Sequence, residues 1–316
     1  MVIYQLLNSK KDMYNLIKNR NNVNMFFKKI IVLVAFLFTG YISAQQDPNF
    51  TLYNFNMIVI NPAYAGSQGA KEINLSHRSQ WVGIDNAPST QSFSFSTPTK
   101  GNIGVGFSIV SDKVFILSQT DLGIDISYKL KVSENHDLFF GMKGGGGFVN
   151  IDLNNAGAMN TDGLFSANQS FFNAHIGAGL YLRHEKYYLT VSTPNFLKGS
   201  RYEKKGNMPS AAIDNSHFYL GGGYIFDIGE NYKLSPALMM RTVAGAPNSY
   251  DISSRLDMHN LIGFGANYRV DEMVSLFSLL NLTKKVIVGF VYDYSTSGVS
   301  DVGADNSIEF LLKYRF

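Results

Sequence analysis

The carboxyl-terminal ten residues alternate between apolar and polar side chains, and this alternation constrains the fold more than any other feature of the chain. They read S-I-E-F-L-L-K-Y-R-F from Ser307 to Phe316. Successive side chains of an extended strand point to opposite faces, so a period of two predicts a β-strand with two different faces. The apolar face carries Ile308, Phe310, Leu312, Tyr314 and Phe316, and the other carries Ser307, Glu309, Lys313 and Arg315.

The same alternation recurs in earlier segments. One face takes carboxylates, lysines, hydroxyls and glycines, whereas the other is almost purely aliphatic and aromatic. Most segments approach the length of a membrane-spanning strand, about 9–11 residues. Strands are therefore predicted at residues 72–81, 92–96, 102–109, 121–130, 138–151, 171–183, 186–192, 217–227, 233–243, 249–259, 261–270, 273–283, 285–295 and 307–316.

The connections between these segments differ in length according to their order. Links that follow even-numbered strands are tight, whereas three links that follow odd-numbered strands, 152–169, 193–216 and 296–306, are the longest in the chain. Bacterial outer-membrane barrels have short periplasmic turns and longer extracellular loops. We interpret the chain as all-β, an outer-membrane β-barrel of about fourteen antiparallel strands with both termini in the periplasm. A soluble β-sandwich gives no reason for this segregation.

Composition and hydropathy exclude several other classes. No apolar run after Ala44 is long enough for a transmembrane helix. The chain has no cysteine, which excludes a disulfide scaffold, a zinc–thiolate site, a thiol nucleophile and a lipoprotein. Its charged residues are only 16% and its net charge is +3, which argues against a nucleic-acid partner.

The amino-terminal 44 residues are predicted to be a secretory signal peptide. Lys28 and Lys29 precede the apolar run 30–38, and Ile42-Ser43-Ala44 forms a small-residue cleavage site before Gln45. Residues 1–24 are interpreted as a mis-assigned upstream start, with Met25 as the better initiator; a genuine extension or a retained anchor is the alternative. The mature chain then comprises an N-terminal segment, 45–70, and the barrel, 71–316.

The N-terminal segment does not alternate and carries distinctive residue blocks. The Asn61-Pro62 pair disfavours a helical Asn61 and starts a turn, and Gly66 permits a left-handed backbone. Arg78 and Gln80 are predicted in the lumen, with Glu72 as the partner of Arg78, and Trp81 in a membrane-interface belt. These blocks have two possible roles: they fix barrel closure or an inward plug, or they contact a partner. The residues are Asp47, Pro48 and Tyr53 in the first block, Asn61, Pro62, Ala63, Tyr64, Ala65 and Gly66 in the second, and Arg78, Gln80, Trp81 and Gly83 in the third.

These blocks resemble the PorP/SprF family of outer-membrane proteins of type IX secretion and gliding motility. Later features also fit, namely Gly289, the Tyr292-Asp293-Tyr294 run and the last strand with Glu309. Family members often have His before that Glu, where this chain has Ile308. The chain end also resembles the barrel assembly signal of outer-membrane proteins, carried here by Phe310, Leu312, Tyr314 and Phe316.

The resemblance implies a role in secreting and attaching a large surface adhesin through the adhesin's C-terminal domain. It also implies a periplasmic partner such as an OmpA-like peptidoglycan-binding protein, in addition to the outer-membrane lipid. The three long links are the expected docking loops. The alternative is a pore for small solutes, since the lumen face is polar. Bulky lumen residues such as Tyr181, Arg183 and Tyr219 favour a filled lumen.

No catalytic, cofactor-binding or metal-binding residue is predicted, and the chain is expected not to be an enzyme. The six histidines lack metal-ligand spacing. His175, and His217 with Asp214, are the only candidates for hydrolase chemistry, and each is better explained as an ordinary polar residue. The run Gly144–Gly147 is interpreted as a bend or as packing against a plug. Asp293, Asp301 and Asp305 are candidates for calcium ligands in an extracellular loop, but a loop whose carboxylates are simply solvated is the better interpretation.

Overall fold

The computed structural model describes residues 50–153, 168–197, 199–200, 213–214, 216–244, 246–296 and 306–316. All of these belong to one compact unit, Gln45–Phe316. The predicted signal peptide, together with Asp47 and Pro48, lies outside the described residues. No helix in the described part of the chain is long and apolar enough to cross a membrane.

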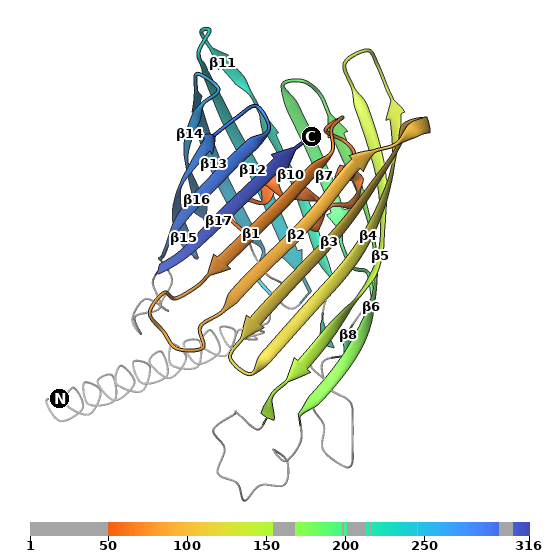
Figure 1. The fold of residues 1–316 in the computed structure, drawn as a ribbon, viewed down its shortest axis with the longest axis vertical. Coiled ribbons are helices and arrows are strands. Elements are labelled where there is room, and N and C mark those ends of the chain that lie inside the picture. Colours follow the sequence, from red (N-terminus) through yellow and green to blue (C-terminus); the bar gives the residue numbers. More distant parts are fainter. Residues whose placement is uncertain are drawn as a thin grey trace, which may run out of the picture. The chain divides into compact units, whose positions relative to one another are not determined.

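Fourteen of the described strands form one closed antiparallel barrel (Figure 1). Each strand pairs with its neighbours in sequence order, and the pairing of the first strand with the last closes the ring. The predicted fold class is therefore confirmed. The strands are β1 (Glu72–Ser79), β2 (Ser89–Pro98), β3 (Ile103–Val114), β4 (Leu117–Lys131), β5 (Asp137–Ile151), β6 (Gln169–Arg183), β7 (Tyr187–Thr193), β10 (His217–Tyr224), β12 (Tyr232–Val243), β13 (Ser249–Met258), β14 (Ile262–Arg269), β15 (Met273–Asn281), β16 (Val286–Ser295) and β17 (Asn306–Arg315).

Three short strands accompany the barrel. β11 (Phe226–Ile228) continues β10 after a break at Ile225 and pairs with the start of β12. β8 (Gly199–Ser200) and β9 (Ile213–Asp214) form a separate two-stranded ribbon. They add no position to the ring of fourteen.

The closing strand has the two faces that its alternation predicts. Phe310 and Leu312 point away from the lumen and are 47% and 42% exposed, while Glu309 and Leu311 are buried. Tyr314 is half-buried and packs edge-on against Phe316, with ring centroids 4.7 Å apart. Apolar side chains on the outer face of a strand suit contact with lipid, and polar ones suit the lumen.

The barrel has two different ends. At the short-turn end lie the links 99–102, 132–136, 184–186, 229–231, 259–261 and 282–285, together with Phe316. At the other end, called the long-loop end, lie three links that extend largely beyond the described residues, and also two tight turns, 115–116 and 270–272. The predicted segregation of loop lengths therefore holds for the longest links and fails for these two turns.

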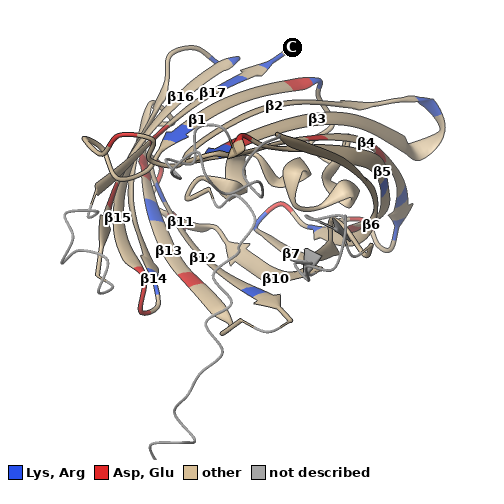
Figure 2. Cartoon of the chain, turned by 90° about the horizontal axis from the view of Figure 1, so that it is seen from below, with Lys and Arg blue, Asp and Glu red and all other residues tan. Residues whose placement is uncertain are grey.

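Residues 50–70 fold into the lumen, and we call them the lumen plug (Figure 2). They form three short 3-10 turns, η1 (Tyr53–Phe55), η2 (Met57–Val59) and η3 (Pro62–Tyr64); a fourth, η4 (Lys100–Asn102), belongs to the wall link. The apolar core of the molecule lies between plug and wall. Its main cluster joins Tyr53, Met57, Ile58, Ile60, Ala63, Tyr64 and Ala65 to Phe139, Tyr181, Tyr219 and Met239.

Candidate functional site: the lumen plug and its anchors

The plug runs through the lumen from the long-loop end to the short-turn end. Phe50 lines a cavity of about 90 Å³ together with Asn195 and His217, which belong to the long-loop end. The plug ends beside Lys71, whose carbonyl accepts a hydrogen bond of 3.0 Å from the backbone N–H of Phe316. The two ends of the plug thus approach opposite ends of the barrel.

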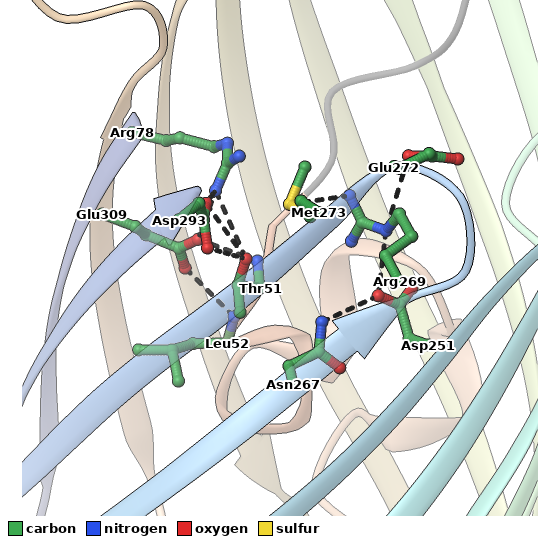
Figure 3. A network of polar contacts seen from close by, with 10 residues as sticks. All are labelled: Thr51, Leu52, Arg78, Asp251, Asn267, Arg269, Glu272, Met273, Asp293 and Glu309. Atoms are coloured by element: carbon green, nitrogen blue, oxygen red, sulfur yellow. Dashed lines mark hydrogen bonds and ion pairs between the residues drawn. The ribbon is translucent and has the colours of Figure 1, made fainter. Parts of the chain in front are cut away.

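Carboxylates of the last two strands hold the start of the plug (Figure 3). Glu309 accepts hydrogen bonds from the backbone N–H groups of Thr51 (2.8 Å) and Leu52 (3.2 Å). Asp293 accepts one from the Thr51 hydroxyl at 3.1 Å. A carboxylate that accepts backbone N–H groups makes strong, charge-assisted bonds, so this contact fixes the plug at its entry.

Arg78 supplies the positive charge that these carboxylates require. Its guanidinium contacts the Asp293 carboxylate directly and lies 3.4 Å from Glu309. The Arg78 side chain is only 1% exposed, so the cluster is almost completely removed from water. Buried ions are tolerated only when they are paired and hydrogen-bonded, which explains why the cation and both carboxylates occur together.

A second buried ion pair lies on the neighbouring strands (Figure 3). The Nε of Arg269 donates to Asp251 at 2.9 Å, and the side-chain amide of Asn267 donates to the same carboxylate at 3.0 Å. Tyr53 of the plug interacts electrostatically with both Asp251 and Arg269 of this pair. Burial, together with the nearby Asp251 charge, raises the pKa of Tyr53 above its ordinary range, so the phenol stays neutral.

Two asparagines fix the middle of the plug to opposite parts of the wall. Asn56 donates to Ser92 at 2.9 Å and accepts from Ser94 at 2.7 Å. Asn61 donates to Thr190 at 2.7 Å, and its side-chain oxygen accepts from the backbone N–H of Ala63 at 2.8 Å. Asn61 therefore caps η3, with Pro62 in the first position, where a missing N–H costs nothing.

Glycines allow the plug to lie directly against the wall. A Cβ on Gly104 would lie 2.0 Å from the carbonyl oxygen of Ala65, and one on Gly141 would lie 2.1 Å from the backbone nitrogen of Ala63. Gly66 has a φ of +67°, which favours glycine, and its N–H donates to Ser96 at 2.8 Å. The distinctive Asn-Pro-Ala-Tyr-Ala-Gly block is thus the part of the plug that touches the wall backbone.

Lys143 crosses from the wall to the plug at another point. Its ammonium lies 3.4 Å from Asp125 and 3.3 Å from the carbonyl oxygens of Ile58 and Val59. In the run Gly144–Gly147, in contrast, the atoms nearest to an added Cβ belong to the wall. Cβ atoms on Gly145 and Gly147 would meet the neighbouring strands β4 and β6 instead, and Gly144 faces open space.

The predicted pairing of Glu72 with Arg78 is wrong. Glu72 binds Lys313 at 2.9 Å and Arg315 at 2.6 Å, both on β17. Residues six apart in a strand are separated by about 20 Å, because each residue advances about 3.3 Å. Sharing a face of one strand therefore does not bring two side chains together, whereas cross-strand register does.

The predicted residues separate into two groups. Tyr53, Asn61 to Gly66 and Arg78 belong to the plug or its anchors. The other three lie in the link after β1: Gln80 donates its N–H to Pro88, Trp81 is half-buried with a φ of 50°, and Gly83 has a φ of 100°. They do not touch the plug through any contact among the described residues. One more anchor is Ser127, whose hydroxyl donates to the carbonyl oxygen of Ala65 at 2.6 Å. The anchors that the sequence did not predict are Thr51, Asn56, Ser127, Lys143, Asp251 and Arg269.

Three of the residues considered for catalysis or metal binding, His175, His217 and Asp293, make other contacts. His175 lies 3.6 Å from Asp121, and the ring of His217 stacks on Tyr219 with centroids 6.3 Å apart. Asp293 is engaged by Arg78 and Thr51, and Asp301 and Asp305 lie outside the described residues. Within the described ranges, no three His, Asp or Glu side chains converge as metal ligands. The absence of enzyme activity stays a prediction.

Comparison with known proteins identifies one family. The model described as "Type IX secretion system membrane protein PorP/SprF" matches residues 42–314. A search of curated proteins finds no match. Similar solved structures include the Ralstonia pickettii toluene transporter TbuX, 10% identical with a TM-score of 0.49, covering 81% of this chain and 91% of that chain. A Pseudomonas aeruginosa FadL homologue is 11% identical with a TM-score of 0.45, covering 86% and 95%.

Proposed function

Because this chain belongs to the PorP/SprF family of type IX secretion system membrane proteins, we propose that it attaches a secreted surface protein to the outer membrane. The chain is an integral outer-membrane β-barrel with a role in secretion. Its cargo in this proposal is a large adhesin of the gliding type, which is recognised through its C-terminal domain. One observation carries the proposal: the plug occupies the lumen of this barrel, although the barrel belongs to a family of secretion proteins.

The occupied lumen favours attachment over solute transport. Cavities of about 320 Å³ and 250 Å³ lie between plug and wall toward the short-turn end, and one of about 90 Å³ lies toward the long-loop end. The plug backbone lies directly against the wall at Gly104 and Gly141, in the short-turn halves of β3 and β5. A pore for small solutes needs a continuous aqueous path, so this packing makes it the weaker hypothesis.

The proposed orientation places the short-turn end in the periplasm and the long loops outside the cell. Short periplasmic turns and longer extracellular loops are the rule for outer-membrane barrels. The segments 152–169, 193–216 and 296–306 then offer the docking surface for the adhesin. An OmpA-like peptidoglycan-binding protein is the proposed partner at the short-turn end.

The proposal is tested by replacing residues 297–305 with a short Gly-Ser link in the chromosomal gene. We expect the adhesin to move from the cell surface to the culture medium, as in a strain that lacks the gene. The matched control replaces the link 282–285 at the short-turn end with the same Gly-Ser link as in the test variant. Surface immunolabelling and blotting of the medium measure the two fractions.

Three results would contradict the proposal. Adhesin that stays on the surface and functions in the gene-deletion strain would exclude an attachment role. Stable single-channel conductance of the purified wild-type barrel in planar bilayers would instead favour the transport hypothesis. Altered solute uptake with normal adhesin display would lead to the same conclusion.

A further inference from the structure

A cavity of about 320 Å³ lies between the plug and the wall at the short-turn end, and we call it the vestibule. Its lining combines aromatic side chains from both with cationic side chains from the wall. Phe55 comes from the plug, Tyr188 from β7, Arg183 from β6, Arg255 from β13, and Lys313 and Arg315 from β17. Its volume falls in the range of small-ligand pockets, which is about 300–1,000 Å³.

The aromatic side chains of the vestibule are held in fixed positions. The ring of Tyr181 lies 5.8 Å from that of Tyr188 and 5.4 Å from that of Tyr64. The guanidinium of Arg255 lies 5.0 Å from the centre of the Phe55 ring. Aromatic faces beside a guanidinium provide both a stacking surface and hydrogen-bond donors. Because these side chains are already packed in place, they lose little conformational entropy when a ligand binds.

The charges of the vestibule do not balance. Arg255 pairs with Asp257 at 2.9 Å, but Lys313 and Arg315 share the one carboxylate of Glu72. Arg183 donates to the carbonyl oxygen of Ser67, a neutral acceptor. With Glu185 counted as well, four cations stand against three carboxylates around this cavity. The vestibule therefore has an excess of positive charge next to its aromatic side chains.

We propose that the vestibule binds an acidic peptide segment that contains aromatic residues and belongs to a partner protein. Arginine forks recognise carboxylates with two parallel hydrogen bonds, and the tyrosines stack on an aromatic side chain of the same segment. A membrane lipid is a poorer occupant, because the cavity lies inside the ring of hydrogen-bonded strands and lipid lies outside it. With the orientation proposed above, the partner is periplasmic.

This site is separate from the adhesin loops. The vestibule opens at the short-turn end, and the proposed docking loops leave the barrel at the other end. Peptide binding to the purified barrel is measured without reference to orientation or cargo. Failure of peptide binding therefore leaves the attachment role intact, and failure of attachment leaves the vestibule site intact.

The test uses the mature full-length barrel in detergent micelles and a fluorescein-labelled random copolymer of glutamate and tyrosine. We expect saturable binding, measured by fluorescence anisotropy, that weakens at least about tenfold at high salt because exposed charge pairs are screened. Arg255→Gln is expected to weaken it by a similar factor, and Arg255→Lys to retain part of it. Lys284→Gln, which removes a cation from a short-turn link away from the cavity, is the matched control.

Heat-modifiable gel mobility shows that each variant is folded before its binding is compared. Equal binding by Arg255→Gln and Lys284→Gln would overturn the proposal, as would absence of saturable binding to the wild-type barrel. Binding of a lysine–tyrosine copolymer with equal affinity would exclude recognition of acidic groups. Saturable binding of labelled soluble peptidoglycan fragments, without binding of the acidic copolymer, would identify a cell-wall ligand instead and also overturn it.

Discussion

The carboxylate of Glu309 accepts a hydrogen bond from the backbone N–H of Thr51, a residue 258 positions earlier in the chain. Thr51 belongs to the plug, and Glu309 to β17, the strand that closes the barrel. Replacing Glu309 with Leu leaves the N–H groups of Thr51 and Leu52 buried without acceptors. Each unpaired buried donor costs about 1–3 kcal/mol, so we expect the free energy of unfolding to fall by at least about 2 kcal/mol.

Guanidinium-induced unfolding in lipid vesicles measures this change through the transition midpoint. Lys285→Gln, at an exposed link of the short-turn end, is the control, and we expect it to stay within about 0.5 kcal/mol of wild type. An unchanged midpoint for Glu309→Leu would mean that the plug contributes no stability through this contact.

Gly141→Ala is expected to displace the plug. The new Cβ would lie 2.1 Å from the Ala63 backbone nitrogen, and neither backbone can yield without moving η3. Forced packing of this kind costs typically about 1–3 kcal/mol. Gly144→Ala on the same strand meets no atom within 4 Å and is the matched control. Planar-bilayer conductance is expected to rise for Gly141→Ala only, and equal conductance of the two variants would contradict the packing argument.

Removing the Arg78 cation leaves two buried carboxylates side by side. Arg78→Met is expected to lower the free energy of unfolding by about 3–5 kcal/mol, because breaking a buried ion pair leaves uncompensated charge. Asp293→Asn in the Arg78→Met background removes one of these charges and is expected to restore part of the loss. The three unfolding midpoints form the measurement. A double variant less stable than Arg78→Met alone would show that Asp293 does not act through its charge.

The mature amino terminus is expected on the opposite side of the membrane from the carboxyl terminus. Phe50 lies toward the long-loop end, and with the predicted cleavage after Ala44 only residues 45–49 precede it. Five residues reach at most about 18 Å, too little to return through a filled lumen. This expectation differs from the periplasmic position that loop lengths alone predict. Gln46→Cys and Lys285→Cys, in a chain with no native cysteine, test it by labelling intact cells with an impermeant maleimide. We expect label on the first only, and equal labelling of both would refute the path of the plug.

The barrel wall could be predicted because each strand carries its own signal. Period-two alternation locates β5, β6, β12 and β17 to within two residues of their observed bounds and assigns Phe310 and Glu309 to the correct faces. The tight turns 115–116 and 270–272 at the long-loop end show that link length alone is a weaker guide.

The plug and its anchors could be predicted only in part. Residues 50–70 form short 3-10 turns, which have no repeating pattern, so Asn61 and Gly66 indicated a bend but not its place in the lumen. The partner of Glu72 depends on the register between β1 and β17, which brings Lys313 and Arg315 beside it. A single sequence contains each charge but not the register that pairs them.

The position of the plug limits how the barrel can open. The plug leads directly into β1, and its first residues are bonded to Glu309 on β17, so the same short segment is tied to both sides of the seam where the ring closes. Separating β1 from β17 sideways would pull Thr51 and Leu52 off their carboxylate and uncover the apolar core. The plug therefore holds this seam together from inside the barrel and opposes a sideways opening between β1 and β17.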